Sequence, residues 1–316
     1  MVTDLRNHIP YKLLVKNNIP EVQWLHTASV PYTAPFFDET ILQCLTRNPG
    51  MARFKCISSL ETMIEASEYI ESVPVTAFIF HISRCGSTLL SQTLGLSERN
   101  IVLAEVPFFD AVLRSDFPDS DTKKRALRAA VKLYGQKRND TSDHYYIKLD
   151  SWSVYYWELL RELWPETPLL LLYRNPADVL RSHQKKAGMQ AVPGLLEPEL
   201  FDITREQVPT LNSDLYLGKV LTYYFRQFEV ISRTSENYRL VSYHQGIENM
   251  LQIIQAVTGV VFDENFIEQA VKRSRFHSKD HSKVFAEAIP EQPVTVFLKD
   301  AFEGFEKLES LRLASL

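Results

Sequence analysis

Short apolar runs alternate with stretches of helical spacing through most of the chain. Five of these runs lack the polar alternation of a strand with one wet face, and they cover residues 75–82, 101–104, 145–149, 169–173 and 238–243. Strands of this kind are buried on both faces, as in parallel sheets covered by helices. The intervening spacing predicts helices near residues 86–96, 122–137, 153–164, 176–187, 213–235 and 246–258. The pattern therefore predicts an α/β, three-layer fold, in which a parallel sheet of about five strands has helices on both faces.

Residues 1–73 follow a different pattern, with prolines, aromatic residues and little alternation. Two short helices are predicted here. One covers residues 38–46 with Asp38 as its N-cap, and the other covers residues 59–71, where Ser58 and Glu61 fit a capping box. We therefore expect a small, mostly helical accessory segment over residues 1–73, packed on a P-loop-like α/β domain over residues 74–316.

The composition is that of an ordinary globular chain with a sizeable core. The 316 residues include 35 Lys and Arg against 39 Asp and Glu, which gives a formal net charge of −4. This balance argues against nucleic acid as a partner, because such surfaces are strongly basic. Three cysteines are too few for a disulfide framework and favour a reduced compartment. Neither an apolar leader nor a membrane-length apolar run is present, so we expect a cytoplasmic protein without membrane insertion.

The first apolar strand leads into the sequence Ser83-Arg84-Cys85-Gly86-Ser87-Thr88-Leu89, which predicts a tight loop and the start of a helix. Loop amides and a helix N-terminus together form an anion site. Compared with a Walker A loop, Gly86 and Thr88 fit, but His81 replaces the first glycine and Ser87 replaces the lysine. The loop is thus expected to hold a phosphate, in a nucleotide with fewer consecutive phosphates than ATP. A turn that only caps a helix is the structural alternative.

The sequence also predicts roles for two further side chains in and before this loop, Cys85 and His81. A phosphatase thiolate at Cys85 would require an arginine six residues later, where Ser91 stands, so Cys85 is expected to be a small packing residue. His81 ends the strand and is expected to be a buried, hydrogen-bonded loop residue.

The fourth apolar strand ends in a second candidate anion site. It continues as Arg174-Asn175-Pro176-Ala177-Asp178, and proline suits the first position of a helix. Ser182 follows Arg174 by about two helical turns, so both side chains are able to converge on one phosphate. Lys186 lies one turn further and is able to assist. A surface arginine with a solvated serine is the alternative.

Together the two motifs resemble those of the sulfotransferase superfamily, whose members use 3′-phosphoadenosine 5′-phosphosulfate (PAPS). The first loop is similar to R-x-G-[ST]-[ST]-L, which holds the 5′-phosphosulfate, and the second is similar to R-[DN]-P-x-D-x-x-x-S, which holds the 3′-phosphate. The resemblance covers about residues 75–285, points to a bacterial sulfotransferase-like group and has a site pattern closest to tyrosylprotein sulfotransferases. It implies that the cofactor-binding residues are Arg84, Cys85, Gly86, Ser87, Thr88, Leu89, Arg174, Ser182, Lys186, Ser278 and Lys279.

The same resemblance implies the catalytic residues. Glu105 follows the second apolar strand, where a carboxylate is costly unless it is paired or functional, and the resemblance makes it the general base. A structural ion pair between Glu105 and Arg84 is the alternative. Lys148 ends the third strand and, with Arg84, is expected to stabilise the transferring group, although Leu149 replaces the proline that usually follows.

The resemblance further implies PAPS as donor, adenosine 3′,5′-bisphosphate as product, no metal, and a small molecule or a peptide as acceptor. Val241-Ser242-Tyr243-His244 is similar to a V-x-Y-E strand with His244 in place of the acid, for which we expect an architectural role. The basic residues 273–283 lie where many sulfotransferases close a lid over the nucleotide, and Ser278 and Lys279 belong to this stretch.

Two alternatives remain open from the sequence. The first is a P-loop kinase-type phosphotransferase, which needs magnesium and the missing Walker lysine. The second is a catalytically inactive nucleotide-binding or sensing protein that has kept the pocket.

Overall fold

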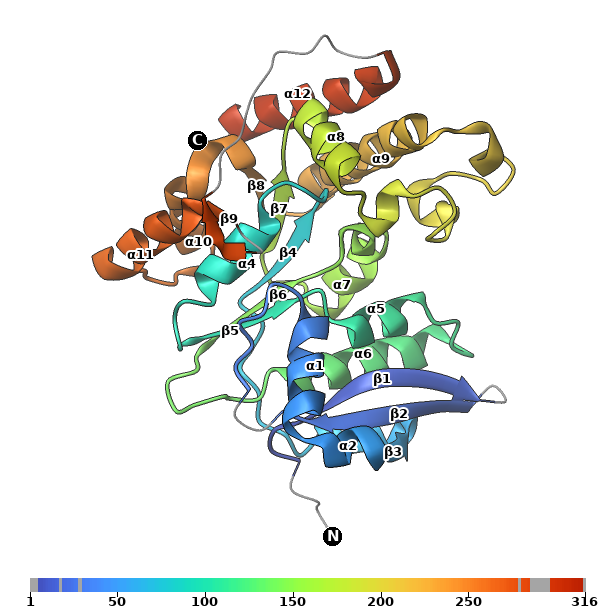
Figure 1. The fold of residues 1–316 in the computed structure, drawn as a ribbon, viewed down its shortest axis with the longest axis vertical. Coiled ribbons are helices and arrows are strands. Elements are labelled where there is room, and N and C mark those ends of the chain that lie inside the picture. The colour runs from blue at the N-terminus through green and yellow to red at the C-terminus, as the bar shows by residue number, and fades with distance from the viewer. Residues whose placement is uncertain (1–4, 17–18, 28–29, 278–279, 285–295, 315–316) are drawn as a thin grey trace. The chain divides into compact units, whose positions relative to one another are not determined.

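The five apolar runs form the strands of one sheet. The structure, a computed structural model, describes residues 5–16, 19–27, 30–277, 280–284 and 296–314. Within these residues the sheet has the order β5-β6-β4-β7-β8 (Figure 1). The strands are β4 (Ala77–His81), β5 (Asn100–Ala104), β6 (His144–Lys148), β7 (Leu169–Tyr173) and β8 (Tyr238–Ser242). Every residue of β4 and β7 is buried, which confirms the predicted α/β fold with strands covered on both faces.

The parallel pairs run in register, so that their carboxyl ends are level. In the pair of β5 and β6, Ala104 lies opposite Lys148, and in the pair of β7 and β8, Tyr173 lies opposite Ser242. The chain runs from β4 to β5 and β6 on one side of β4, and it then crosses to β7 and β8 on the other side. Ligands of open α/β sheets bind beyond the carboxyl ends of the strands at such a switch point, so the residues that follow each strand define where a site is expected.

The chain divides into two compact units that share β4. The first unit contains Met1–Phe78, Ser91–Asp150 and Leu159–Thr167, and the second contains Ile79–Leu90, Ser151–Glu158 and Pro168–Leu316. In the first, Thr76 N donates to Tyr145 O of β6 at 2.7 Å, and in the second, Ile82 N donates to Leu172 O of β7 at 3.2 Å. The accessory role of residues 1–73 stays a prediction.

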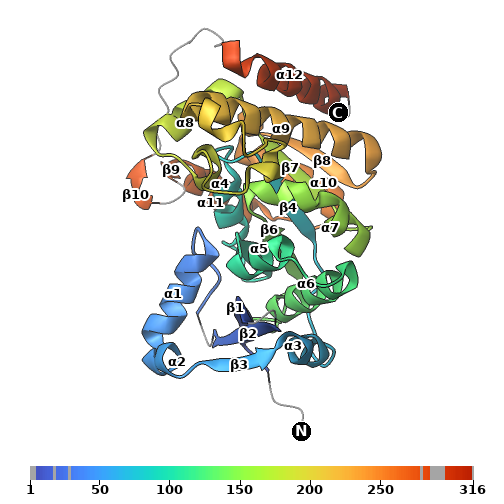
Figure 2. The same cartoon turned by 90° about the vertical axis from the view of Figure 1, so that its right-hand side faces the viewer.

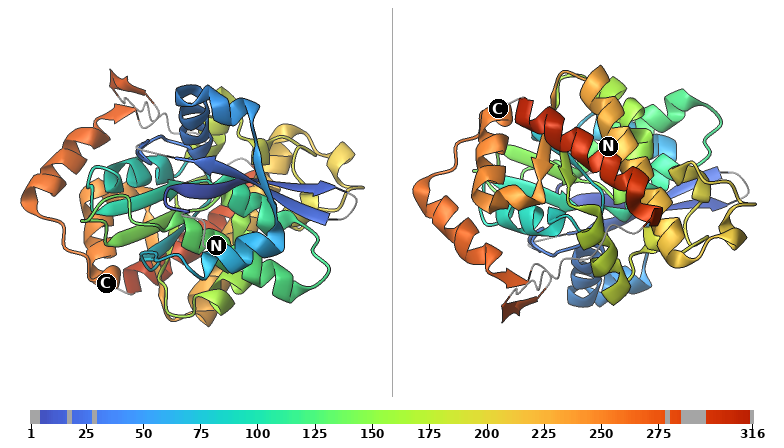
Figure 3. Two further views of the ribbon diagram at one scale, coloured as in Figure 1. Left: turned by 90° about the horizontal axis from the view of Figure 1, so that it is seen from below. Right: turned by 90° about the horizontal axis from the view of Figure 1, so that it is seen from above.

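Helices follow the strands in both units. The predicted helices are present as α4 (Ser87–Leu94), α6 (Ser120–Tyr134), α8 (Pro176–Lys185), α9 (Ser213–Thr234) and α10 (Gly246–Thr258). The stretch 153–164 begins as a 3₁₀ turn and becomes helical only as α7 (Trp157–Leu163). Among the described residues, four helices lie where none was predicted, namely α2 (Pro49–Arg53), α5 (Pro107–Arg114), α11 (Glu264–Ser274) and α12 (Lys299–Ala314). In the second unit α12 packs against α9 (Figure 3).

The N-terminal segment contains a sheet that the sequence pattern did not predict. An antiparallel sheet of order β1-β2-β3 is formed by β1 (His8–Lys16), β2 (Ile19–His26) and β3 (Cys56–Ser59) (Figure 2). The pattern was missed because β2 buries four consecutive residues, Val22 to Leu25, and so shows no alternation. Within the first unit β1 packs on α5 and α6. The description of this segment as mostly helical therefore needs this correction.

The helices of the N-terminal segment are present, but their caps differ from those predicted. They are α1 (Phe37–Arg47), α2 (Pro49–Arg53) and α3 (Leu60–Ser67). The N-cap of α1 is Phe36, so Asp38 lies in the first turn, where its carboxylate still interacts favourably with the helix dipole. The N-cap of α3 is Ser59, whose Oγ accepts a hydrogen bond from Thr62 N at 3.1 Å. Both differences are shifts of a residue or two at a helix start.

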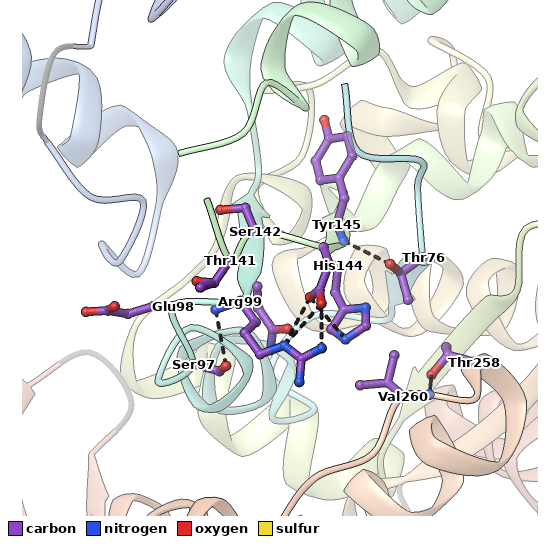
Figure 4. A network of polar contacts seen from close by, with 12 residues as sticks. Thr76, Ser97, Glu98, Arg99, Thr141, Ser142, His144, Tyr145, Thr258 and Val260 are labelled. Atoms are coloured by element: carbon purple, nitrogen blue, oxygen red, sulfur yellow. Dashed lines mark hydrogen bonds and ion pairs between the residues drawn. The ribbon is translucent and has the colours of Figure 1, made fainter. Parts of the chain in front are cut away.

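The amino ends of β5 and β6 are joined by a surface ion pair (Figure 4). Arg99, one residue before β5, donates to the carboxylate of Asp143, one residue before β6, at 2.5 Å. His144 Nε2 lies 3.3 Å from the same carboxylate. Both partners of the ion pair are more than two-fifths exposed, so the pair contributes little to stability. This edge of the first unit is therefore an ordinary solvated surface.

Candidate functional site

The loop after β4 has an unusual backbone. Ser83 and Arg84 adopt positive φ values of 66° and 51°, and Gly86 has φ of 85°. Non-glycine residues in this region are strained by about 1–3 kcal/mol each, and such residues concentrate at ligand-binding sites. Because α4 begins at Ser87, the loop directs the first amides of a helix toward its own concave side. The predicted loop and helix start are thus present.

Gly86 is required by space as well as by its backbone. A Cβ atom at this position would lie 2.6 Å from Cδ2 of Tyr243, closer than real contacts allow. The Tyr243 ring also carries the guanidinium of Arg174 on its face, with Cζ 4.2 Å from the ring centroid. Tyr243 therefore packs against both the loop after β4 and Arg174, and burial raises the pKa of its phenol.

His81 and Cys85 play the supporting roles that the sequence predicted. His81 is 5% exposed, and its Nδ1 accepts a hydrogen bond from Ser83 N at 3.1 Å. Cys85 is fully buried, and its Sγ donates to Leu172 O of β7 at 3.3 Å. Both side chains hold the loop in its strained conformation.

Arg174 follows β7 and is buried, with 6% of the residue exposed. Its Nε donates to Asp178 Oδ2 at 3.3 Å, and its Nη1 donates to the backbone oxygen of Arg84 at 3.4 Å. The next residue, Asn175, caps α8 by accepting from Ala177 N at 2.9 Å, with Pro176 at the first helical position as predicted. The second motif is therefore joined to the first loop through Arg174.

Asp178 lies close to two arginines and one histidine. Besides Arg174, it accepts a hydrogen bond from Arg181 at Oδ1, and His244 Nε2 lies 4.0 Å from Oδ2. Arg181 was not among the predicted residues, because it sits between the motif positions. We call Arg84, Gly86, Arg174, Asp178 and Tyr243 the anion site.

Two further predicted residues lie at the end of α8. Arg84 Nη2 donates to the backbone oxygen of Lys186 at 2.5 Å, so the structure brings Lys186 to the loop through its main chain, while its side chain is exposed. Ser182 is half-buried, and its carbonyl accepts from Lys186 N at 3.2 Å. The convergence of Arg174 and Ser182 on one phosphate stays a prediction, as does the phosphate contact of the Lys186 side chain.

Glu105 lies directly after β5 in the first unit, and its backbone is strained. Its φ is 58°, and its N donates to Lys148 O at 2.8 Å, which extends the pairing of β5 with β6 by one residue. A left-handed glutamate costs free energy that a glycine would avoid, and such strain is typical of functional positions. Its side chain is 21% exposed, so the carboxylate reaches solvent.

Lys148 is the partner of Glu105. Its Nζ donates to Glu105 Oε1, and its side chain is fully buried. The ammonium also lies 5.5 Å from the centre of the Phe36 ring, a cation–π contact. The sequence alternative paired Glu105 with Arg84, whereas the pairing that the structure gives Glu105 within its own unit is with Lys148.

Further carboxylates surround this pair. Burial, then the charges of Glu105 and Asp110, raise the pKa of Asp150 well above its usual range. Burial and the charge of Glu105 also raise the pKa of Asp38. Asp110 itself accepts from Arg114 Nη1 at 2.9 Å. We call Glu105, Lys148, Asp150, Asp38 and Phe36 the carboxylate–lysine site.

The lid predicted near residue 279 lies only partly within the described residues. Ser278 and Lys279 lie outside the described residues. The stretch predicted as a basic loop contains two paired strands, β9 (Phe276–His277) and β10 (Asp280–Val284). Their role in binding stays a prediction.

The sequence analysis did not assign Arg181, Asp38 or Phe36 to a site. It gave Tyr243 only an architectural role. Tyr243 had one readable signal, its position directly after a buried strand of the sheet. Asp38 and Phe36 had none, because they reach Glu105 and Lys148 only through the fold of the N-terminal segment.

Among the described residues, no group of three or more histidine, cysteine, aspartate or glutamate side chains has the arrangement of a metal site. No helix in the described part of the chain is both long and apolar enough to cross a membrane.

Comparisons with known proteins gave structural likenesses only. No family model matches the chain, and no curated protein matches it. Among solved structures it is similar to a sulfotransferase from Alicyclobacillus acidocaldarius, with 14% identity, a TM-score of 0.43, and coverage of 76% of this chain and 96% of that chain. It is also similar to sulfotransferase STF1 from Mycobacterium tuberculosis, with 11% identity, a TM-score of 0.44, and coverage of 85% and 83%.

A third similar structure is sulfotransferase STF9 from Mycobacterium avium, with 13% identity, a TM-score of 0.43, and coverage of 81% of each chain. These identities and scores are low, so the fold is taken from the sheet of this chain itself, and the chemistry is taken from its own side chains.

Proposed function

We propose that this protein is a PAPS-dependent sulfotransferase that moves a sulfuryl group to a hydroxyl or amine of a small molecule or peptide. The observation that carries the proposal is the union of two phosphate-binding motifs in one unit. The buried Arg174 donates to the backbone of the Arg84 loop, and Tyr243 packs against both motifs. Such a pair of sites suits a ligand with two separate phosphate-type groups.

The residues of the anion site fit that donor better than they fit ATP. Ser87 stands where a kinase has its phosphate-binding lysine, and it is 4% exposed. The strained loop and the start of α4 supply amides for one anionic end. Arg174, already aligned by Asp178, supplies a guanidinium for the other.

The carboxylate–lysine site supplies the groups that transfer chemistry requires. Glu105 carries a carboxylate oxygen that is able to take the acceptor proton, because its side chain is partly exposed at the end of β5. Lys148 donates a hydrogen bond that orients this carboxylate, and its ammonium is able to stabilise negative charge that develops in the transition state. Arg84 is proposed to do the same from the loop.

The donor supplies a sulfuryl group already activated on a phosphate: the acceptor oxygen or nitrogen forms a bond to sulfur as the bridging oxygen leaves with its electron pair on adenosine 3′,5′-bisphosphate. The acceptor proton goes to Glu105. The predicted cytoplasmic location is part of the proposal, and the free cysteines Cys44, Cys56 and Cys85 agree with a reducing compartment.

The first test is calorimetric titration with adenosine 3′,5′-bisphosphate, with ATP and magnesium in a parallel titration. We expect selective binding of the bisphosphate, which Arg174→Ala abolishes and Arg226→Ala leaves unchanged, since Arg226 is an exposed arginine paired with Asp202. A preference for magnesium–ATP would instead support the kinase-type alternative. Bisphosphate binding without PAPS turnover on a panel of phenols, alcohols and amines would support a sensing protein.

A further inference from the structure

Asp178 lies close to two guanidinium groups and one imidazole, which come from three different elements of the second unit. Arg174 comes from the end of β7, Arg181 comes from α8, and His244 comes from the 3₁₀ turn η5 (Tyr243–Gln245). The carboxylate is 11% exposed and divides its oxygens between them. Oδ1 accepts from Arg181, whereas Oδ2 accepts from Arg174 and lies 4.0 Å from His244 Nε2.

His244 is held in this position by its own turn. Ser242 N donates to Gln245 Oε1 at 2.9 Å in a capping box that fixes both ends of η5. The neighbouring Tyr243 ring is packed against Gly86 and Arg174, so the backbone of His244 is anchored to the anion site. Its imidazole is 55% exposed and is therefore in contact with solvent protons.

The local charge depends on the protonation of this imidazole. Two guanidinium groups against one carboxylate leave a single positive charge beside the anion site, and a protonated His244 adds a second. A histidine side chain takes up a proton as the pH falls, so the cluster becomes more positive in that direction. A phosphate-type dianion is attracted more strongly by the more positive cluster.

We propose that His244 is a protonation-dependent binding residue of the anion site, which tightens the binding of a phosphate-type dianion as the pH falls. The proposal rests on the proposed function, because it takes the 3′-phosphate of the donor and product as its ligand. It assigns a binding role to a residue for which the sequence indicated only architecture.

The other ionisable groups around His244 do not reproduce this behaviour near neutral pH. On α8 these groups are the carboxylate of Asp178 and the guanidinium of Arg181, and at the end of β7 the group is the guanidinium of Arg174. Histidine is the side-chain type whose charge ordinarily changes near neutral pH, and none of these three is a histidine. On its own turn Tyr243 has a pKa raised by burial, so the phenol stays neutral. Cys85 of the loop faces Tyr243 and is fully buried.

The test measures binding of adenosine 3′,5′-bisphosphate and of inorganic sulfate to the full chain between pH 5.5 and 8.5. The variants are His244→Gln, which is always neutral, and His244→Lys, which is always charged. We expect wild type to bind about threefold more tightly than His244→Gln at the acid end and equally at the alkaline end. His244→Lys should bind at the tighter level throughout, a gain that a misfolded variant cannot produce.

Each arm of the experiment has its own control. The second ionisation of a phosphate near pH 6 changes the bisphosphate itself, but it acts equally on all variants, and sulfate stays a dianion throughout. His144→Gln removes a histidine that also lies beside an aspartate, at 3.3 Å in the first unit, and should leave the profile unchanged.

Parallel pH profiles of wild type and His244→Gln would overturn the inference even if PAPS turnover were found. A His244-dependent profile for sulfate, without bisphosphate binding or PAPS turnover, would uphold the inference and overturn the proposed function. Absence of binding of either anion at every pH would overturn both.

Discussion

The anion site and the carboxylate–lysine site bury charge of opposite sign. At the anion site Arg174 and the neighbouring Arg181 share Asp178, so positive charge is in excess. In the carboxylate–lysine site a single buried lysine faces Glu105, with Asp150 and Asp38 nearby. Each buried cation is nevertheless paired, as the cost of burying an isolated charge requires.

The difference fits the two tasks that the proposed function assigns to these sites. A phosphosulfate donor is anionic and needs cations that are already desolvated and oriented, so its side of the reaction requires an excess of positive charge. Removal of a proton from an acceptor needs an ionised carboxylate, so the other side requires negative charge. The chain places these charges in its two units and uses backbone strain in both, at Arg84 and at Glu105.

The sharpest way to separate the two sites is Glu105→Gln. The amide keeps the size of the side chain but cannot take a proton, so PAPS turnover should fall by about 10²–10⁴-fold while binding of adenosine 3′,5′-bisphosphate stays nearly unchanged. Initial rates and calorimetric titration measure the two effects. Glu98→Gln is the matched control, because Glu98 is exposed before the same strand (Figure 4). Turnover near the wild-type rate would refute Glu105 as the base.

The converse change is Gly86→Ala, which acts on the anion site alone. The added Cβ collides with the Tyr243 ring and disturbs its stacking with Arg174, so binding of the bisphosphate should weaken by about tenfold. Titration calorimetry measures this. Gly259→Ala is the control, since Gly259 also has a positive φ, 71°, but has open space around it. Gly259→Ala should cost stability through strain and leave binding intact. Equal binding losses in both variants would contradict the role of the Tyr243 contact.

A smaller effect is expected for Asp150→Asn on stability. Because its pKa is raised in the folded state, the folded protein binds more protons than the unfolded chain above the ordinary aspartate pKa of about 4. Stability therefore falls as the pH rises through this window, and the asparagine removes the loss. Thermal unfolding should show a melting temperature raised by about 2 °C at pH 7.5 and unchanged at pH 4.

Asp110→Asn serves as the control for this prediction, because Asp110 is paired with Arg114 and the variant should lose stability. If the melting temperature of Asp150→Asn does not exceed that of wild type at pH 7.5, the ionised carboxylate of Asp150 does not destabilise the folded protein.

Much of the core was predictable because its signals are local. Apolar runs without alternation marked all five parallel strands, and Asn175-Pro176 marked the start of α8. The loop around Gly86 was readable because a glycine, a helix start and a preceding strand form one short motif. The hairpin of β1 and β2 was not, because β2 buries consecutive residues and so resembles no single-face pattern.

The sequence by itself determined which residue types follow each strand: Arg84 after β4, Glu105 after β5, Lys148 at the end of β6 and Arg174 after β7. Register then made their proximity within each unit a consequence of parallel pairing. Only the tertiary structure decided the partners, Glu105 with Lys148 and Asp178 with Arg174, Arg181 and His244. Side-chain pairing depends on which groups share a low-dielectric space, and that space is formed by packing between segments far apart in the chain.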